Sequence, residues 1–363
     1  MRRYEPLNRA TMTPGSAYDT EHNNLAFDAM LWQYSATVAG TPANVAEDGA
    51  FRMLGTPEVS QAEEPLIRIE GRTLRHLAAF TAGGYAKTLA PAAAGGALAE
   101  AMLDFGKILP GAYVSGEVKA FVRGNVGGLA DYSGTAPTSM AGNLRNAVAT
   151  IDRPPGLSHP RPFYREFSIP IPANVSDQQH LITIDQDMVS AGLFCLVRDA
   201  DGGGSSPGGA RTDGLVRGVK VEITRGRDGQ KTQLNLTMGQ LRSLTARLAG
   251  FTDLDWDQAT GTFFIPFVDD SDPRFGGRMA LQQGDTVLLT VDSNSTIEEH
   301  LGSAVTAASG DEIRVVRLDH QIIGGSVSVP DRAAPVSARQ ALAVAPAATV
   351  SRGGRRRRRG RTR

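Results

Sequence analysis

A short internal repeat constrains the fold of this 363-residue chain more than any other feature of its sequence. Residues 74–83 and 241–250 are identical at six of ten positions, at a constant offset of 167 residues. The identical pairs are Leu74/Leu241, Arg75/Arg242, Leu77/Leu244, Ala79/Ala246, Ala82/Ala249 and Gly83/Gly250. Leucines at i and i+3, several alanines and a final glycine are typical of a short helix that ends in a left-handed residue. The repeat therefore predicts helices at Leu74–Ala82 and Leu241–Ala249.

The same offset relates the residues that precede each copy. Ile67 and Ile69 align with Leu234 and Leu236, and each pair has the alternation of a β-strand. Each copy is thus a strand that leads into a short helix. Two such units at a fixed offset indicate a duplicated domain, with one helix inserted at the equivalent point of each half.

Length and composition agree with two β-rich domains. A chain of 363 residues is long enough for two domains, each with its own core. The 41 glycines and 20 prolines favour turn-rich β structure over a helical bundle. Cys195 is the single cysteine, which excludes an intramolecular disulfide. It lies in the apolar run 192–197, so we expect a buried thiol without a catalytic role.

The C-terminus concentrates positive charge. Residues 352–363 contain eight arginines and no acidic residue, whereas the rest of the chain has 30 basic and 38 acidic residues, a formal charge near −8. The arginines are Arg352, Arg355, Arg356, Arg357, Arg358, Arg359, Arg361 and Arg363. Because guanidinium groups pair well with phosphate, we expect this tail to contact nucleic acid or an anionic membrane. A disordered, solubilising end is the alternative interpretation.

Composition divides the chain into five segments. Residues 1–25 are polar, so we expect an irregular arm, followed by a first folded half at residues 26–150. Residues 151–162 contain four prolines, which favour an extended, semi-rigid linker. Residues 163–325 then form the second half, and residues 326–363 an extended tail. The first residues lack the apolar core of a secretory signal, and no stretch is apolar enough to span a bilayer.

Strand patterns are clearest in the second half. The candidate strands are Tyr164–Ile171, Leu181–Gln186, Gly192–Arg198, Leu215–Arg225, Lys231–Leu236, Thr262–Val268, Asp285–Val291 and Glu312–Ile323. A helix at Met238–Ala249 separates the fifth strand from the sixth. Eight strands without alternating helices are typical of a jelly roll, two sheets packed face to face. The sequence therefore predicts an all-β fold of two tandem jelly-roll β-sandwiches, a double jelly roll, each with a short helix at the equivalent point.

Acidic residues follow the second repeat helix. Asp253, Asp255 and Asp257 resemble the start of a calcium-binding loop. The glycine and glutamate that complete such a loop are replaced by Gln258 and Phe264. We therefore favour a solvated acidic turn over a calcium site.

No other motif indicates catalysis. The six histidines never pair at the spacing of a zinc site, and no phosphate-binding loop occurs. The single Gly-x-Ser-x-Gly match, centred on Ser206, lies in a glycine-rich loop and is followed by Pro207. A nucleophile elbow needs a sharp strand-to-helix turn instead. The sequence thus indicates a protein that is not an enzyme and has no cofactor or metal site.

The duplicated jelly rolls and their helices resemble the double jelly-roll major capsid proteins of tailless, membrane-containing icosahedral phages. The resemblance covers roughly residues 26–325 and rests on the repeat and the architecture. In that family a helix follows the strand lettered F in each barrel, which would be Leu74–Ala82 and Leu241–Ala249 here. It implies a virion protein, made in the host cytoplasm, whose homotrimers form pseudo-hexagonal capsomers of an icosahedral shell. Its partners would be other copies of itself, other virion proteins, and an internal membrane or packaged genome met by the tail.

Two other classes of function stay open. A duplicated jelly-roll spike or carbohydrate-binding protein should present clustered aromatic residues on exposed loops, yet loops 124–143 and 199–213 contain only Tyr132. A nucleic-acid-binding protein should interleave basic and aromatic residues on a folded face. Here the basic excess is confined to the arginine tail.

Overall fold

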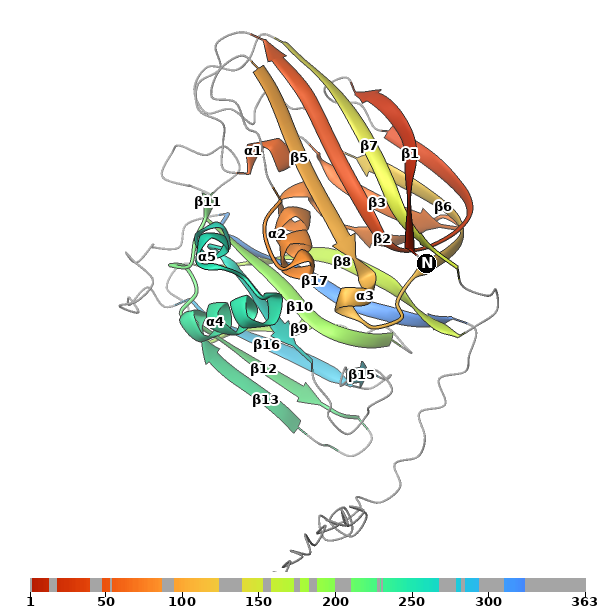
Figure 1. Ribbon diagram of the computed structural model, residues 1–363. Helices are drawn as coiled ribbons and strands as arrows, with labels where there is room; N and C mark the ends of the chain where they lie inside the picture. The colour runs from red at the N-terminus through yellow and green to blue at the C-terminus, as the bar shows by residue number, and fades with distance from the viewer. Residues whose placement is uncertain are drawn as a thin grey trace, which may run out of the picture. The chain divides into compact units, whose positions relative to one another are not determined.

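The fold is mainly β, with few helices (Figure 1). It was obtained as a computed structural model. The structure describes residues 2–12, 18–39, 48–52, 54–86, 95–123, 139–152, 158–172, 177–182, 188–199, 210–226, 229, 231–267, 279–281, 285–293 and 310–323.

The first half of the chain contributes seven strands and three helices to the described structure. They are β1 (Arg2–Met12), β2 (Tyr18–Ala39), α1 (Gly49–Arg52), β3 (Thr56–Gln61), β4 (Glu64–Arg68), α2 (Gly71–Ala82), β5 (Gly95–Asp104), α3 (Phe105–Ile108), β6 (Val114–Arg123) and β7 (Ser139–Ile151).

The second half contributes the remaining described elements. They are β8 (His159–Pro170), β9 (Gln178–Ile182), β10 (Met188–Asp199), β11 (Ala210–Arg211), β12 (Gly218–Thr224), β13 (Lys231–Thr237), α4 (Met238–Ala249), α5 (Asp253–Gln258), β14 (Thr262–Pro266), β15 (Met279–Leu281), β16 (Thr286–Asp292) and β17 (Glu312–Ile323). Each of the eight candidate strands of this half overlaps an observed strand, although β12 begins three residues later than expected, at Gly218.

The strands form two sheets. A 13-stranded sheet runs in the order β1-β7-β2-β6-β3-β4-β8-β17-β10-β11, with β5 paired to β2 and with β14 and β15 paired to β10. A four-stranded sheet runs in the order β13-β12-β16-β9. The large sheet is continuous between the halves because β4 pairs in parallel with β8.

The strand pairings of the first half recur in the second. The pairs β1·β7, β2·β7 and β2·β5 of the first half correspond to β8·β17, β10·β17 and β10·β14. In the same way β3·β4 and β3·β6 correspond to β12·β13 and β12·β16. All ten pairings are antiparallel, so the duplication seen in the sequence extends to the strand topology.

Both helices expected from the repeat are present. α2 begins at Gly71, three residues before the expected Leu74, and α4 occupies Met238–Ala249 as expected, so the two helices start 167 residues apart. Gly83 and Gly250 end them in the left-handed region, with φ of 79° and 74°. Their N–H groups donate to the carbonyls of Ala79 and Ala246. A glycine adopts this conformation without the steric cost of a Cβ atom.

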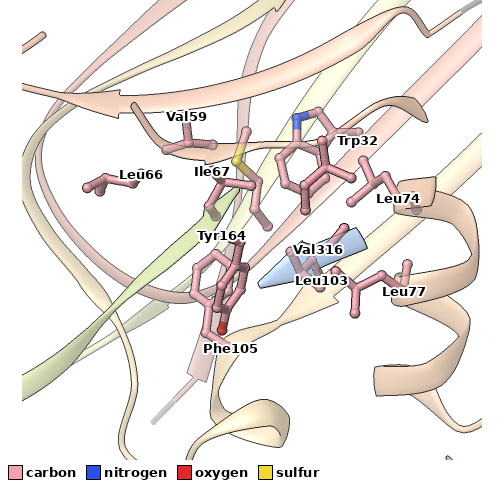
Figure 2. Packing of buried hydrophobic residues seen from close by; sticks show 14 of the residues in the cluster. Trp32, Val59, Leu66, Ile67, Leu74, Leu77, Leu103, Phe105, Tyr164 and Val316 are labelled. Atoms are coloured by element: carbon pink, nitrogen blue, oxygen red, sulfur yellow. The ribbon is translucent and has the colours of Figure 1, made fainter. Parts of the chain in front are cut away.

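Two apolar clusters stabilise the fold. The first contains residues of both halves: Trp32 and Phe105 from the first, and Tyr164 and Val316 from the second, all at most 1% exposed (Figure 2). The second cluster lies within the second half and includes Cys195. Cys195 is fully buried, as expected, and burial raises the pKa of its thiol. It therefore packs as a small apolar residue and has little thiolate character.

Residues 1–25 are not the irregular arm that their polar composition suggested. β1 occupies Arg2–Met12 and pairs with β7 along its length, and β2 begins at Tyr18. β1 lies at the edge of its sheet, where one row of main-chain hydrogen bonds holds a strand that need not be apolar. An edge strand of this kind leaves no clear alternation in the sequence.

The expected linker at 151–162 is also partly a strand. β8 begins at His159, and Pro160 and Pro162 lie within it opposite Ile322 and His320 of β17. Backbone groups two residues apart face the same edge of a strand, so both proline nitrogens can face away from β17. Residues 153–157 lie outside the described residues; in the rest of the segment the extended backbone was predicted correctly, but its incorporation into a sheet was not.

Candidate functional site

A buried group of charged side chains lies where the two halves meet. We name it the Asp48 cluster, and its members are Asp48, Arg72, Arg75, His76, Tyr85 and Arg211. The carboxylate of Asp48 is fully buried and pairs with Arg75 and, at 2.9 Å, with Nε of Arg211. His76 Nε2 lies 3.0 Å from the same carboxylate, and His76 Nδ1 lies 2.7 Å from the Tyr85 hydroxyl. One carboxylate thus interacts with several cationic or polar groups.

Local structure places these side chains. Asp48 precedes α1, and its carbonyl accepts the N–H groups of Phe51 and Arg52. Arg72, Arg75 and His76 project from α2 at spacings of three and four residues, which place them on one helix face. Arg211 comes from β11 in the second half. The cluster therefore joins three elements that are distant in the sequence.

Burial dominates the electrostatics of the cluster. It lowers the pKa of Arg72 to about 9, together with the charges of Arg198 and Arg52. It also lowers the pKa of His76 to about 3, despite the neighbouring Asp48, so the imidazole is neutral at pH 7. Burial alone would raise the pKa of Asp48, but contacts with His76, Arg211 and Arg75 outweigh it and hold the pKa well below its usual range. The cluster is thus an ionised aspartate surrounded by arginines, with a neutral histidine.

The repeat places an equivalent arginine in the second half. Arg242, which aligns with Arg75, pairs with the buried carboxylate of Asp213. Its guanidinium lies 4.1 Å from the ring centroid of Trp256, and its Nη2 donates to the Trp256 carbonyl at 2.6 Å. Asp213 also accepts the N–H of Gly261 at 2.7 Å. In each half, an arginine of the repeat helix therefore pairs with a buried aspartate of the same half.

The sequence contained a signal for this pairing that was not used. An arginine recurs at the same position of the two repeat helices, which suggests that both have a buried acceptor. The acceptors could not be found in the same way, because Asp48 and Asp213 are 165 residues apart and do not follow the offset of 167.

Further contacts cross between the halves around α2. Arg75 Nη2 donates to Gln258 Oε1 at 3.0 Å, and the N–H of Tyr85 donates to Asp255 Oδ1 at 3.0 Å. Glu70 pairs with Arg198 at 2.9 Å. These contacts lie beside the parallel pairing of β4 with β8, so α2 is attached to the second half along its length.

The acidic motif after the second repeat helix is part of this junction. Asp253, Asp255 and Asp257 belong to α5, so the expected turn is wrong, although Asp253 and Asp257 are exposed as expected. Asp255 Oδ2 accepts the N–H and hydroxyl of Thr252, at 2.9 and 2.6 Å, and so caps the helix. The aspartates that suggested calcium therefore begin a helix.

The two repeat helices differ at their N-termini. In α4, Thr237 and Gln240 form a capping box, in which each side chain accepts the backbone N–H of the other residue. In α2 the acceptor is Glu166 of β8, which receives the N–H of Glu70 at 2.5 Å and the hydroxyl of Thr73 at 2.7 Å. Burial and the nearby Glu70 raise the pKa of Glu166. A side chain of the second half thus caps the N-terminus of a helix in the first half.

Replacing Glu166 with Ala should lower the free energy of unfolding by about 1–2 kcal/mol, the usual effect of removing an N-terminal cap. Urea unfolding monitored by circular dichroism measures this. The matched control is Glu222→Ala, because Glu222 pairs with Lys220 on a partly exposed face and such pairs contribute about 1 kcal/mol or less. Equal losses in the two variants would contradict a capping role for Glu166.

The Asp48 cluster has the components of a proton relay, but the two central side chains are buried. The side chains of His76 and Asp48 are both 0% exposed, so nothing in solution reaches the imidazole. Among the described residues, no group of three or more His, Cys, Asp or Glu side chains could hold a metal ion. The arrangement is therefore suited to joining the two halves.

Other residues singled out in the sequence have separate positions. His320 is fully buried, and its Nε2 lies 2.8 Å from the Tyr164 hydroxyl. Ser206 and the eight tail arginines lie outside the described residues. No helix in the described part of the chain is long and apolar enough to cross a membrane.

Comparison with solved structures identifies the fold. The chain superposes on the major capsid protein of Sulfolobus turreted icosahedral virus with a TM-score of 0.60, covering 89% of this chain and 97% of that one at 12% identity. It superposes on the capsid protein of the virus PBCV-1 with a TM-score of 0.57, covering 89% of this chain and 94% of that one, also at 12% identity. No protein-family model and no curated protein sequence matches the chain. The chain therefore has the fold of viral major capsid proteins, as its resemblance to capsid proteins implied.

Proposed function

We propose that the chain is a major capsid protein, a non-enzymatic component of an icosahedral virion shell. The observation that carries the proposal is the superposition along nearly the whole length of two viral capsid proteins. The interior supports it, because the polar groups of the Asp48 cluster connect structural elements, and its Asp48 and His76 side chains are closed to solvent.

We propose further that the chain is two tandem jelly rolls, at roughly 26–150 and 163–325. The strand pairings common to both halves support this division, as do the repeat helices α2 and α4, each of which follows the strand paired with β3 or β12. β1 adds an edge strand to the first jelly roll, ahead of the boundary that composition suggested.

In this proposal the chain assembles as a homotrimer. Two jelly rolls in each chain give six in a trimer, which suits a pseudo-hexagonal capsomer, and closed symmetry is the general expectation for homo-oligomers. Native mass spectrometry of the purified chain should show a trimer, and electron microscopy of concentrated protein or purified particles should show hexagonal capsomers. A stable monomer at micromolar concentration would argue against this function.

The arginine tail is proposed to face the shell interior and bind phosphate groups of the membrane or the genome. The rest of the chain is near −8, so Arg352–Arg363 is the segment that phosphate should prefer. Binding to anionic vesicles and to duplex DNA should weaken steeply between about 50 and 200 mM salt. A version ending at Ser351 should lose this binding and keep its oligomeric state. Unchanged binding after truncation would mean that the tail does not bind phosphate and acts only as a solubilising end.

A further inference from the structure

The junction within one chain is built from two strand edges. β4 is the strand that leads into α2, and β8 is the first strand of the second half. They pair in parallel, with Ile67 opposite Tyr164 and Arg68 opposite Arg165. This pairing extends one sheet from the first half into the second and accompanies the ion pairs around α2.

The duplication produces a second copy of each of these edges. β13 leads into α4 as β4 leads into α2, and β1 pairs with β7 as β8 pairs with β17. β13 ends the four-stranded sheet and pairs only with β12 among the described strands, while β1 ends the large sheet and pairs only with β7. In the described chain, β4 and β8 pair with each other, whereas the equivalent edges of β13 and β1 have no strand beside them.

Burial shows the difference between a used edge and an unused one. Ile67 and Ile69, in and beside β4, are each 1% exposed. The repeat aligns them with Leu234 and Leu236 of β13, which pack against the second apolar cluster but remain partly exposed. A hollow of about 320 Å³ is lined by residues of β12, β13 and β16, with Leu236 and Asn235 among them. Strand β13 thus leaves part of its apolar surface exposed, where β4 buries the equivalent residues.

We propose that β13 of one copy pairs in parallel with β1 of a second copy, which repeats between chains the β4·β8 junction within a chain. The occupant is a second copy because β1 is the counterpart of β8, the strand that occupies the corresponding position beside β4. An exposed strand edge presents unpaired N–H and C=O groups that another strand can satisfy. Such a head-to-tail contact uses different surfaces on the two copies, and rings form when the rotation closes.

This inference rests on the proposed trimer and specifies how its chains meet. With one edge of each kind on every chain, a closed ring of three uses all of its β1 and β13 edges. The ring would then contain six junctions, three within chains and three between chains. All six would pair a strand that leads into a repeat helix with the first strand of a half.

Cross-linking tests the contact directly. Pro6 of β1 and Asn235 of β13 are exposed, and the native Cys195 is fully buried, so introduced cysteines at the two exposed positions would be the reactive ones. The double variant Pro6→Cys/Asn235→Cys, treated with a short, flexible bismaleimide, should lose its monomer band and give covalent species of up to three chains. Each single variant should give none, because the proposed contact pairs β1 with β13 and neither strand with its own copy.

A matched control uses the opposite edge of the same sheet. Gln179 of β9 is also exposed, and Pro6→Cys/Gln179→Cys should not cross-link. Hydrogen exchange provides a measurement on the unmodified protein, in which assembly should slow the amides of β1 and β13 and leave those of β9 unchanged. A native trimer without these two results would overturn the junction and leave the proposed function standing. Cross-linking of either single variant would also overturn it, and a chain that stays monomeric would overturn both.

Discussion

Replacing Asp48 with Asn should lower the free energy of unfolding by about 3–5 kcal/mol, because it removes a buried negative charge that several cations share. The Asp48 carboxylate is fully buried and pairs with Arg75 and Arg211, while Arg72 lies 4.0 Å away. Without it, these guanidinium groups would remain close together in a medium that solvates charge poorly. This is the loss expected when one partner of a buried ion pair is removed.

Asparagine is the appropriate replacement because it changes the charge and little else. Asp48 has a φ of 56°, in the left-handed region that asparagine tolerates better than most residues. Urea unfolding followed by tryptophan fluorescence measures the change, since Trp32 lies in the core that both halves share. Glu64→Gln is the control, because Glu64 pairs with Arg161 at 3.1 Å but is 46% exposed, so its loss should be less than about 1 kcal/mol. Equal losses would mean that the cluster does not stabilise the junction.

The same substitution should weaken the contact between the halves. Arg211 belongs to the second half and reaches Asp48 of the first across 163 residues of sequence. Loss of this pair should therefore increase proteolysis and hydrogen exchange around β11 and α1 before global unfolding. A variant that loosens only at the chain termini would contradict this account.

Local patterns in the sequence predicted the elements that are defined by their own periodicity. The repeat predicted α2 and α4, and alternation predicted β17 to the residue. Strand β1 has no such pattern, because its main-chain pairing with β7 requires no apolar face. The helical capping of α5 was obscured by the spacing of its aspartates, which matched half of a calcium loop.

The candidate site could not be assembled from the sequence because its contacts are long-range. Nothing close to Asp48 indicates that Arg211 is its partner, and nothing close to Glu70 indicates that Glu166 caps the helix that follows it. The parallel pairing of β4 with β8 is equally invisible, because periodicity shows which face of a strand is buried but not which strand lies beside it. These contacts depend on how the two halves pack against each other. The repeat indicates that the halves are alike, but not which surfaces of them meet.

Acid should destabilise the protein through His76 before its carboxylates are protonated. Burial, with Arg211 and Arg75 nearby, lowers the pKa of His76 to about 3, whereas an unfolded histidine has a pKa of about 6.5. Between these values the unfolded chain binds a proton that the folded chain does not. Its contribution to stability is therefore complete above pH 6.5 and falls by up to about 1.4 kcal/mol per pH unit as the pH decreases towards 3.

The window from about pH 6.5 to 4.5 contains this effect together with those of the lowered pKa of His180 and the raised pKa of Glu166, so a variant of His76 is needed to separate it. The lowered pKa of Asp48 acts in the same direction, but only below the ordinary aspartate pKa of about 4. Free energies of unfolding are measured in urea at several pH values, and His76 should account for a decrease of about 2–3 kcal/mol across the window in the unmodified protein. His76→Gln, which has no group to protonate, should reduce that slope by about one proton, while His159 and His320 are the same in both proteins. Equal slopes of stability against pH in the two proteins would show that His76 takes up its proton in the folded state as readily as in the unfolded chain. The description of His76 as buried and neutral in the Asp48 cluster would then be wrong.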